Sequence, residues 1–449
     1  MLAGPKNPPL RHWRVDYRIL DNLRSLHRMA QSMTESATLL NSQISFLVRP
    51  SLDVDIFTAD IAQDTHVALV HIPLPLYPLF MHAISQLLLH NDRKDAEGRA
   101  FKPARPWHHW YPFVNVSVTA TECSIVCPRE DAEQVFTPLL GALDPAARRL
   151  VTISREDFSV IVIGGAGLEA GQRVLDLTGP LALSGIPIFF ITSYWSDFIL
   201  VPLKARSRVI SALEDRGFVF EAEENGEAGH MTNPASPLMH PHHRDISASS
   251  SDFPPTPSTP PPATVPELQV KTFKTLAKNN IDPSIEEGLI LVTCAGSKDS
   301  TADSQATSFT EGKLQHGLLK CLTSAAPPHF LSITLTDTES ASVTLDKNLL
   351  HHFANEGEDL LLGKDGPEQV AVTFDLSKLP EQSTGIVCGV ASRLIDGMKG
   401  RMSSEIFNMS YLSTARAGHV IVYEDELQDA LTALRGMHEN GVNGVHLDA

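Results

Sequence analysis

The sequence predicts an α+β protein made of four β-α-β-β-α-β modules in two tandem pairs, and three observations support this class. Residues 157 to 220 show one complete succession of strand and helix patterns. Residues 370 to 434 repeat most of this succession. Between them, the stretch from 233 to 267 is rich in proline, serine and threonine, with too few aliphatic residues to fold. We therefore expect a disordered linker between the two halves.

The complete module begins with a continuous apolar run, DFSVIVIGG at 157 to 165, which favours a buried strand. Leucine and valine then recur at helical spacing until Ser184-Gly185. The stretch IPIFFITSYWSDFILVPL at 186 to 203 contains two apolar runs around a short polar and aromatic interruption, which is typical of a hairpin. A helical pattern over 204 to 217 and a short strand at 218 to 220 complete the module.

The repeat is clearest in the hairpin and the helix that follows it. Residues 192 to 213 align without a gap with residues 413 to 434. Strand, helix and hairpin patterns at 66 to 127 and at 289 to 345 predict two further copies. The predicted boundaries are an N-terminal extension at 1–40, modules at 41–150 and 151–225, a disordered Pro/Ser-rich linker at 226–283, and modules at 284–365 and 366–449.

Composition and charge exclude several classes of function. The chain has 36 basic and 53 acidic residues, and its net charge of −17 would repel a nucleic acid backbone. Five scattered cysteines are typical of a reducing compartment, so we expect a cytoplasmic protein. No apolar run reaches the roughly 18 to 20 residues of a membrane-spanning helix. Arginines in the first thirty residues suggest a transit peptide, but Asp16 and Asp21 interrupt them.

Motifs for catalysis and for cofactors are weak. The glycines at 165 and 167 follow a strand and open a helix, as in a dinucleotide fold, but the next strand lacks the carboxylate that binds the ribose. Cys123 and Cys127 lie in a predicted strand, where their spacing puts them about 13 Å apart, too far to share a metal ion. No common hydrolase, protease or kinase motif is present. We expect no catalytic residues, no cofactor and no metal.

Glycines and small polar residues at the start of a module's first helix can bind a free amino acid. Their backbone N–H groups can hold its carboxylate, and nearby carbonyls can hold its ammonium group. Residues 164 to 167 and Ser383-Thr384-Gly385 have this composition. The alternative, that each stretch is only a tight turn, remains open.

These residues resemble a known family. The stretch at 179 to 213 is similar to the second ACT domain of the CASTOR family, cytosolic arginine sensors built from four ACT-like modules in two tandem pairs. The likeness extends to 71–89 and 114–131 in the first module and to 384–397 and 411–431 in the fourth. It implies a ferredoxin-like fold and a non-catalytic regulator. Family members bind arginine between the second and fourth modules and, when ligand-free, hold a multi-subunit complex upstream of the TOR growth kinase.

The resemblance implies a ligand site on the second and fourth modules: Pro187, Ile188, Ser383, Thr384, Gly385, Ile386, Thr414, Ala415 and Gly418. Two carboxylates that hold the guanidinium in the family correspond here to Ser383 and Gly418, which cannot pair a cation. Pro187 also lacks a backbone N–H. Glu381 would compensate only if its loop shifted, and Arg416 would oppose a cationic ligand. We therefore expect a free amino acid as the ligand, and the sequence leaves open whether it is arginine or another.

The resemblance also implies a partner-binding surface at the tip of the second module's hairpin, on Tyr194, Trp195 and Asp197. An exposed tyrosine and tryptophan beside an acid have the composition of an interface. A tip covered by another module is the alternative. Three further alternatives stay open: a homodimer, an ACT-domain scaffold or adaptor that binds no ligand, and a regulatory relative of aspartokinase ACT domains.

Overall fold

Four segments of the chain each fold into strand, helix and hairpin in the computed structural model. They are called here the first unit (66–157), the second unit (158–220), the third unit (291–362) and the fourth unit (369–435). The structure describes residues 58–61, 66–89, 111–164, 170–216, 218–220, 262–297, 304–354, 360–380, 382–399 and 407–436, all within the compact unit Ile56–Ala449. The predicted extension at 1–40, most of the predicted linker and the glycines at 165 and 167 lie outside the described residues.

The first and third units share one sheet. The first unit contains β2 (Val67–Ile72), η1 (Leu74–Leu76), α2 (Tyr77–Leu89), β3 (Val114–Thr119), β4 (Cys123–Pro128), α3 (Arg129–Asp131), η2 (Ala132–Phe136), α4 (Thr137–Ala142), α5 (Pro145–Leu150) and β5 (Thr152–Ile153). The third contains β11 (Leu291–Gly296), α9 (Ser304–Leu322), β12 (Phe330–Leu335), β13 (Ser342–Asp346), η4 (Lys347–Phe353) and β14 (Leu361–Leu362). The strand order is β5-β2-β4-β3-β12-β13-β11-β14. β3 and β12 pair over their full length, from Val114↔Leu335 to Thr119↔Phe330.

The second and fourth units share the other sheet. Its N-terminal half contains β1 (Thr58–Ile61), β6 (Phe158–Gly164), α6 (Ala170–Leu183), β7 (Phe189–Thr192), β8 (Asp197–Pro202), η3 (Leu203–Ala205), α7 (Arg206–Glu214) and β9 (Val219–Phe220). Its C-terminal half contains β10 (Ser284–Ile285), β15 (Gln369–Asp375), α10 (Ile386–Met398), β16 (Met409–Ser413), β17 (Ala417–Tyr423), η5 (Glu424–Glu426) and α11 (Leu427–Arg435). The strand order is β9-β1-β6-β8-β7-β16-β17-β15-β10. β1 was expected in the first module, but it pairs between β6 and β9.

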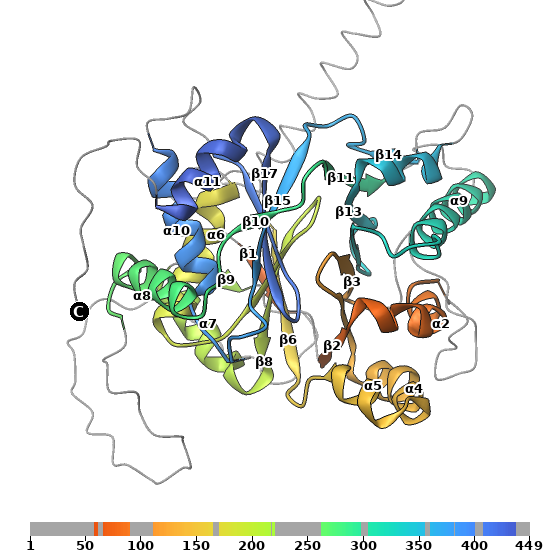
Figure 1. Ribbon diagram of the computed structural model, residues 1–449, viewed down its shortest axis with the longest axis horizontal. Helices are drawn as coiled ribbons and strands as arrows, with labels where there is room; N and C mark the ends of the chain where they lie inside the picture. Colours follow the sequence, from red (N-terminus) through yellow and green to blue (C-terminus); the bar gives the residue numbers. More distant parts are fainter. Residues whose placement is uncertain are drawn as a thin grey trace, which may run out of the picture. The chain divides into compact units, whose positions relative to one another are not determined.

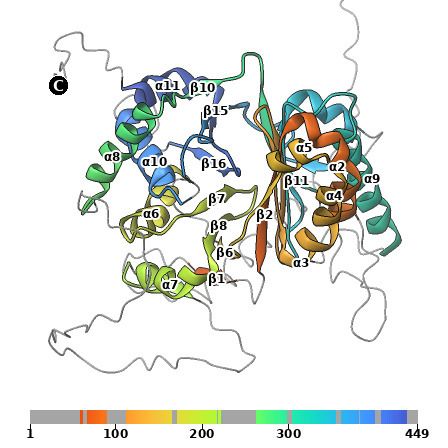
Figure 2. The same ribbon diagram turned by 60° about the horizontal axis from the view of Figure 1, so that its bottom comes forward.

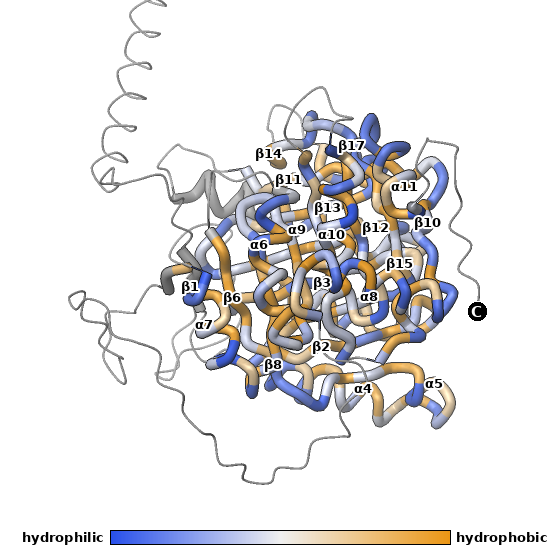
Figure 3. The backbone as a smooth tube through the Cα atoms, turned by 90° about the vertical axis from the view of Figure 1, so that its left-hand side faces the viewer, coloured by the Kyte–Doolittle hydropathy of each residue, from blue (hydrophilic) through white to orange (hydrophobic). Residues whose placement is uncertain are grey.

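The two sheets face each other and the helices cover their outer sides (Figure 1). Figure 2 shows α6, α8 and α10 on one outer side and α2, α5 and α9 on the other. The strand alternation explains the layers, since each strand sends apolar residues both to the helices and to the facing sheet. In β6, Ile161 and Ile163 pack under the helices, while Phe158 and Val160 pack between the sheets. Figure 3 shows this strand as a largely hydrophobic segment.

The predicted hairpin repeat is present in three dimensions. Ser193 N–H donates to the Ser196 carbonyl at 2.9 Å, and Thr414 N–H donates to the Ala417 carbonyl at 2.9 Å. In each turn the side chain of the first residue also accepts from the backbone N–H three residues later, at 3.0 and 3.2 Å. The two turns therefore have the same geometry although their sequences, SYWS and TARA, differ.

The predicted end of the linker at residue 283 is wrong, because α8 (Val265–Lys278) lies inside it. Thr264 caps the helix by accepting from Glu267 N–H at 3.4 Å, and a proline occupies its first turn. Leu268, Thr272 and Leu276 are buried on one face of the helix. The prolines before residue 264 dominated the composition of the window, whereas the helix depends on apolar residues that come after them.

Cys123 and Cys127 lie in a strand, as predicted, and both are buried free thiols. Burial raises the pKa of both thiols. None of the described helices is long and apolar enough to span a membrane.

Candidate functional site

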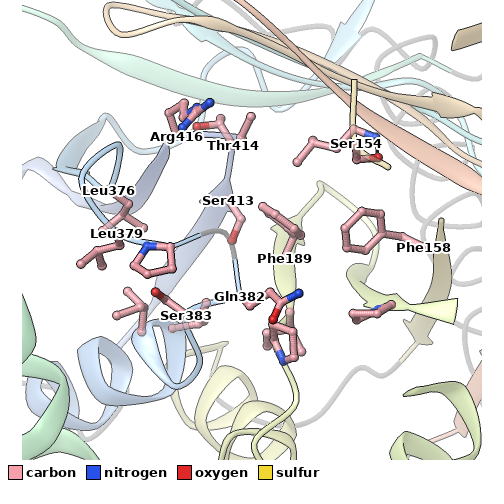
Figure 4. A pocket seen from close by; sticks show the side chains of 18 of the residues that line it. Ser154, Phe158, Phe189, Leu376, Leu379, Gln382, Ser383, Ser413, Thr414 and Arg416 are labelled. Atoms are coloured by element: carbon pink, nitrogen blue, oxygen red, sulfur yellow. Dashed lines mark hydrogen bonds between the residues drawn. The ribbon is translucent and has the colours of Figure 1, made fainter. Parts of the chain in front are cut away.

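A cavity of about 680 Å³ lies beside the seam between the second and fourth units (Figure 4). The seam between β7 and β16 has a single backbone pair, Leu412↔Ile191, whereas β3 and β12 pair over six residues. Side-chain hydroxyls provide two further links: Phe190 N–H donates to Ser413 Oγ at 2.9 Å, and Tyr411 N–H donates to Thr192 Oγ1 at 3.1 Å. The cavity therefore lies at the less continuously paired of the two seams.

Three of the four units contribute to the cavity wall. Figure 4 shows Leu376, Leu379 and Ser383 of the fourth unit opposite Phe158 and Phe189 of the second. Thr414 and Arg416 lie at one end of the cavity in the same view. The first unit contributes Leu69, His71 and the stretch 151–156. The lining therefore combines an apolar wall with hydroxyl groups and few charges, as is usual in sites for small molecules.

Helix α10 begins at the cavity. Gly385, its N-cap, has a left-handed backbone with φ of 83° and offers no side-chain cap. Ile386, Val387 and Cys388, which form the first turn, line the cavity. The first N–H groups of a helix have no partner inside it and favour a negative charge, so a ligand carboxylate is suited to this end of the cavity.

Glycine is required at position 385 for a second reason. A Cβ there would lie 2.6 Å from Leu268 of α8, in addition to the cost of a left-handed backbone. The Gly385 carbonyl also accepts from Thr272 Oγ1 of α8 at 3.1 Å. The helix that was missed in the predicted linker therefore supports the start of α10.

The structure places seven of the nine predicted ligand residues on the cavity: Pro187, Ile188, Ser383, Gly385, Ile386, Thr414 and Ala415. Thr384 and Gly418 do not line it. Gly418 lies in β17 opposite Ser413, and a Cβ there would collide with the Tyr411 hydroxyl. The absence of a side chain at Gly418 is thus explained by the packing of Tyr411. Glu381 lies outside the described residues.

The charges around the cavity are few. Glu156 is paired with Lys204. Arg416 forms no ion pair with any residue that the structure describes. The described lining therefore carries no carboxylate that is free to balance a cationic ligand.

The lining from the first unit was missed by sequence reasoning. His71 and the residues 151–156 line the cavity from a different sheet, together with residues of the fourth unit that lie far along the chain. No local pattern encodes such contacts. Among the described residues, no group of three or more histidine, cysteine, aspartate or glutamate side chains could hold a metal ion.

Two of the three residues predicted for the partner surface are exposed, and the third is buried. Tyr194 and Trp195 are 38% and 41% exposed. Asp197 is 1% exposed and forms an ion pair with Arg173 on α6, so it cannot contact a partner from the surface. Burial raises the pKa of Asp197, and the Arg173 guanidinium opposes that rise.

The tip of this hairpin also contacts the third unit. Tyr194 N–H donates to Ser342 Oγ at 2.8 Å, and Trp195 Nε1–H donates to Ser340 Oγ at 3.0 Å. The tip is therefore partly covered, and its two aromatic rings, packed edge to face, keep the remaining exposed area.

Comparison with known proteins identifies one domain. Residues 153–215, which cover the second unit through α7, match the family model of the ACT domain. This segment of the chain is thus an ACT domain with an α+β, ferredoxin-like fold. No curated protein sequence matches the chain significantly.

Several solved structures resemble parts of the chain. A structural-genomics protein from Agobacterium tumefaciens is 16% identical, with 39% of this chain and 100% of that chain covered and a TM-score of 0.24. Aspartate kinase from Synechocystis is 12% identical over 88% of this chain, at a TM-score of 0.28, and the alignment spans 59% of the kinase. The ligand-free regulatory subunit of aspartate kinase from Thermus thermophilus is 15% identical, with 34% and 95% covered and a TM-score of 0.22.

Proposed function

We propose that the protein is a non-catalytic regulator that binds a free amino acid in the cavity between the second and fourth units. The observation that carries this proposal is the cavity, which adjoins the ACT domain at the seam between β7 and β16. The first turn of α10, which has no side-chain cap, lines the same cavity. We also propose that all four units are ACT-like modules, because the first, third and fourth have the same order of strand, helix and hairpin as the second.

The proposed ligand is an amino acid with an uncharged side chain rather than arginine. Leu379, Ile386 and Tyr411 offer apolar contact, and the carboxylate of the ligand would lie at the start of α10. A buried guanidinium would find no unpaired carboxylate among the described lining residues and would cost several kcal/mol. Arg416 would add repulsion.

Isothermal titration calorimetry of the purified protein against the twenty amino acids tests both statements. We expect a neutral, apolar amino acid to bind most tightly and arginine to bind at least about tenfold more weakly, since a lost charge partner is worth more than 1.4 kcal/mol. Arginine as the tightest ligand would refute the ligand class. Silence from all twenty would refute the amino-acid-binding role.

A finer proposal follows from the resemblance to the CASTOR family. We propose that the protein acts in the cytoplasm by holding a multi-subunit complex upstream of the TOR kinase, and that the exposed pair Tyr194 and Trp195 contributes to that contact. Aromatic side chains with a polar end are favoured in such interfaces. An adaptor that binds no ligand would use the same surface, so the response to an added amino acid separates the two roles.

Affinity purification from cells in the presence and absence of the bound amino acid tests this finer proposal. The double variant Tyr194→Ser with Trp195→Ser should lose the captured complex. Leu150→Ser, at another exposed apolar position that is 57% exposed, is the control and should retain it. Capture that ignores the amino acid would indicate an adaptor.

A further inference from the structure

The turn at 414–417, which forms one wall of the cavity, is held in place by the first unit. Arg416 N–H donates to Glu122 Oε1 at 2.6 Å, and Ala415 N–H donates to Ser124 Oγ at 3.0 Å. All four residues of the turn line the cavity, whereas Glu122 and Ser124 do not. Glu122 and Ser124 therefore hold this part of the wall in place on the side away from the cavity, where a ligand would not contact them.

Glu122 holds a second part of the wall as well. Its other oxygen, Oε2, is hydrogen-bonded to Nδ1 of His71, which also lines the cavity. The same carboxyl group therefore joins His71 of β2 to the turn at 414–417. The Glu122 side chain is fully buried. A buried carboxylate with both oxygens engaged fixes its partners firmly, because breaking either bond leaves a desolvated charge unsatisfied.

A matching arrangement holds the turn of the second unit's hairpin, away from this cavity. The turn at 193–196 is held by the third unit, where Ser196 Oγ donates to Glu339 and Tyr194 N–H donates to Ser342 Oγ at 2.8 Å. None of these four residues lines the cavity. The two glutamates end similar sequences, TATE at 119–122 and TDTE at 336–339. The first runs from the last residue of β3 into the hairpin loop, and the second lies in the loop between β12 and β13. The turn held by Glu122 lines the cavity and the turn held by Glu339 does not, so Glu339 provides an internal control.

We propose that Glu122 is a positioning residue of the ligand site, so that affinity for the amino acid depends on the docking of the fourth unit's turn against the first unit. This inference rests on the proposed function, since it concerns the same cavity. It assigns to the first unit the role of holding the turn at 414–417 in place for the ligand.

Four variants of the full chain test the inference: Glu122→Ala, Glu122→Gln, Glu339→Ala and Glu339→Gln. Calorimetry would use leucine, phenylalanine and whichever of the twenty amino acids binds the wild type most tightly. We expect Glu122→Ala to weaken binding about tenfold or more, since it removes the acceptor of two hydrogen bonds. Glu122→Gln keeps an acceptor oxygen for Arg416 N–H and should recover part of the affinity.

The Glu339 variants are the control. They should leave the dissociation constant within about twofold of the wild type, because the contact of Glu339 with Ser196 lies away from the cavity. If Glu339→Ala weakens binding as much as Glu122→Ala, or if Glu122→Ala binds like the wild type, the inference is wrong. Should Glu122→Ala fail to fold, the milder pair Ser124→Ala and Ser342→Ala makes the same comparison.

A measurement without a ligand separates this inference from the proposed function. Hydrogen exchange should be faster at the amide of Arg416 in Glu122→Gln and unchanged there in Glu339→Gln, since Glu122 accepts from this amide and Glu339 does not. If the wild type binds no amino acid, the proposed function fails, while the exchange result still decides whether Glu122 positions the wall. Equal exchange in both variants would overturn it.

Discussion

At the residue scale, His419 illustrates how burial changes an ordinary side chain. It lies on β17 between the sheets, 1% exposed, with Nδ1 hydrogen-bonded to Thr373 Oγ1 at 2.9 Å and its ring packed edge to face against Phe330. Its Nε2 has no hydrogen-bond partner among the residues that the structure describes. Burial lowers the pKa of His419 to about 4, and nearby Glu122 opposes the shift. The ring is therefore neutral in the folded protein.

This shift predicts a loss of stability in mild acid. Between pH 6.5 and pH 4 the unfolded chain binds a proton at His419 that the folded protein does not, so the free energy of unfolding falls as the pH falls. The contribution is about 3 kcal/mol over this window. Urea unfolding of the wild type and of His419→Leu at several pH values measures it. The difference between the two proteins should shrink or reverse from pH 7 to pH 4, and a constant difference would contradict the assignment.

Residues were predictable from the sequence where their role is local. Ser383 and Gly385 belong to a short stretch of small residues at the start of a helix, whereas Ile386, Pro187 and Ile188 were predicted from the resemblance to the CASTOR family. The resemblance to the CASTOR family implied that Asp197 lies on the partner surface, but it is buried and forms an ion pair with Arg173 of α6. Its burial depends on a partner 24 positions earlier in the chain, which the local pattern does not show.

At the element scale, the contact between α8 and α10 explains a glycine at the N-cap of α10 and another inside the helix. A Cβ at Gly389 would lie 2.5 Å from Thr272 Oγ1, and a Cβ at Gly385 would meet Leu268. These helices approach closely only because position 389 has no side chain. The predicted helix at the start of the fourth unit was correct, but the helix that packs against it was assigned to a linker.

This contact predicts an unusual response to alanine. Gly389→Ala should destabilise the protein by about 1 to 3 kcal/mol through overpacking, although alanine favours a helix by about 1 kcal/mol. Gly312→Ala in α9 is the matched control, because nothing lies within 4 Å of its added Cβ. It should stabilise the protein by about 0.5 to 1 kcal/mol. Chemical denaturation of both variants measures the changes, and stabilisation in both would contradict the packing argument.

At the scale of the whole molecule, both sheets join the two halves of the chain. The six-residue pairing of β3 with β12 links the first and third units, and the helices of the second and fourth units share one hydrophobic core. Single backbone pairs, Val67↔Phe158 and Leu291↔Gln369, also join β2 to β6 and β11 to β15 between the two sheets. Each half alone would leave strand edges and apolar surface exposed.

We therefore expect the halves to fold together when they are expressed as separate chains. Residues 56–220 with an affinity tag and residues 262–436 without one should co-purify as a 1:1 complex after co-expression. Each fragment expressed alone should aggregate or bind a hydrophobic dye, because its seam strand is unpaired. Size-exclusion chromatography and circular dichroism provide the measurements. Two independently folded, monomeric fragments would contradict the shared cores.

The sequence by itself determined the succession of strands and helices, the repeated hairpin and the small residues at the start of α10. These features depend on local periodicity, on turn chemistry and on glycine positions, which are written in consecutive residues. The tertiary structure alone decided that α8 packs on α10, that Asp197 is buried, and that Glu122 of the first unit holds the turn beside the cavity. Each of these features depends on a contact between residues that are distant in the chain. A pattern of consecutive residues does not show which distant residue will be the partner.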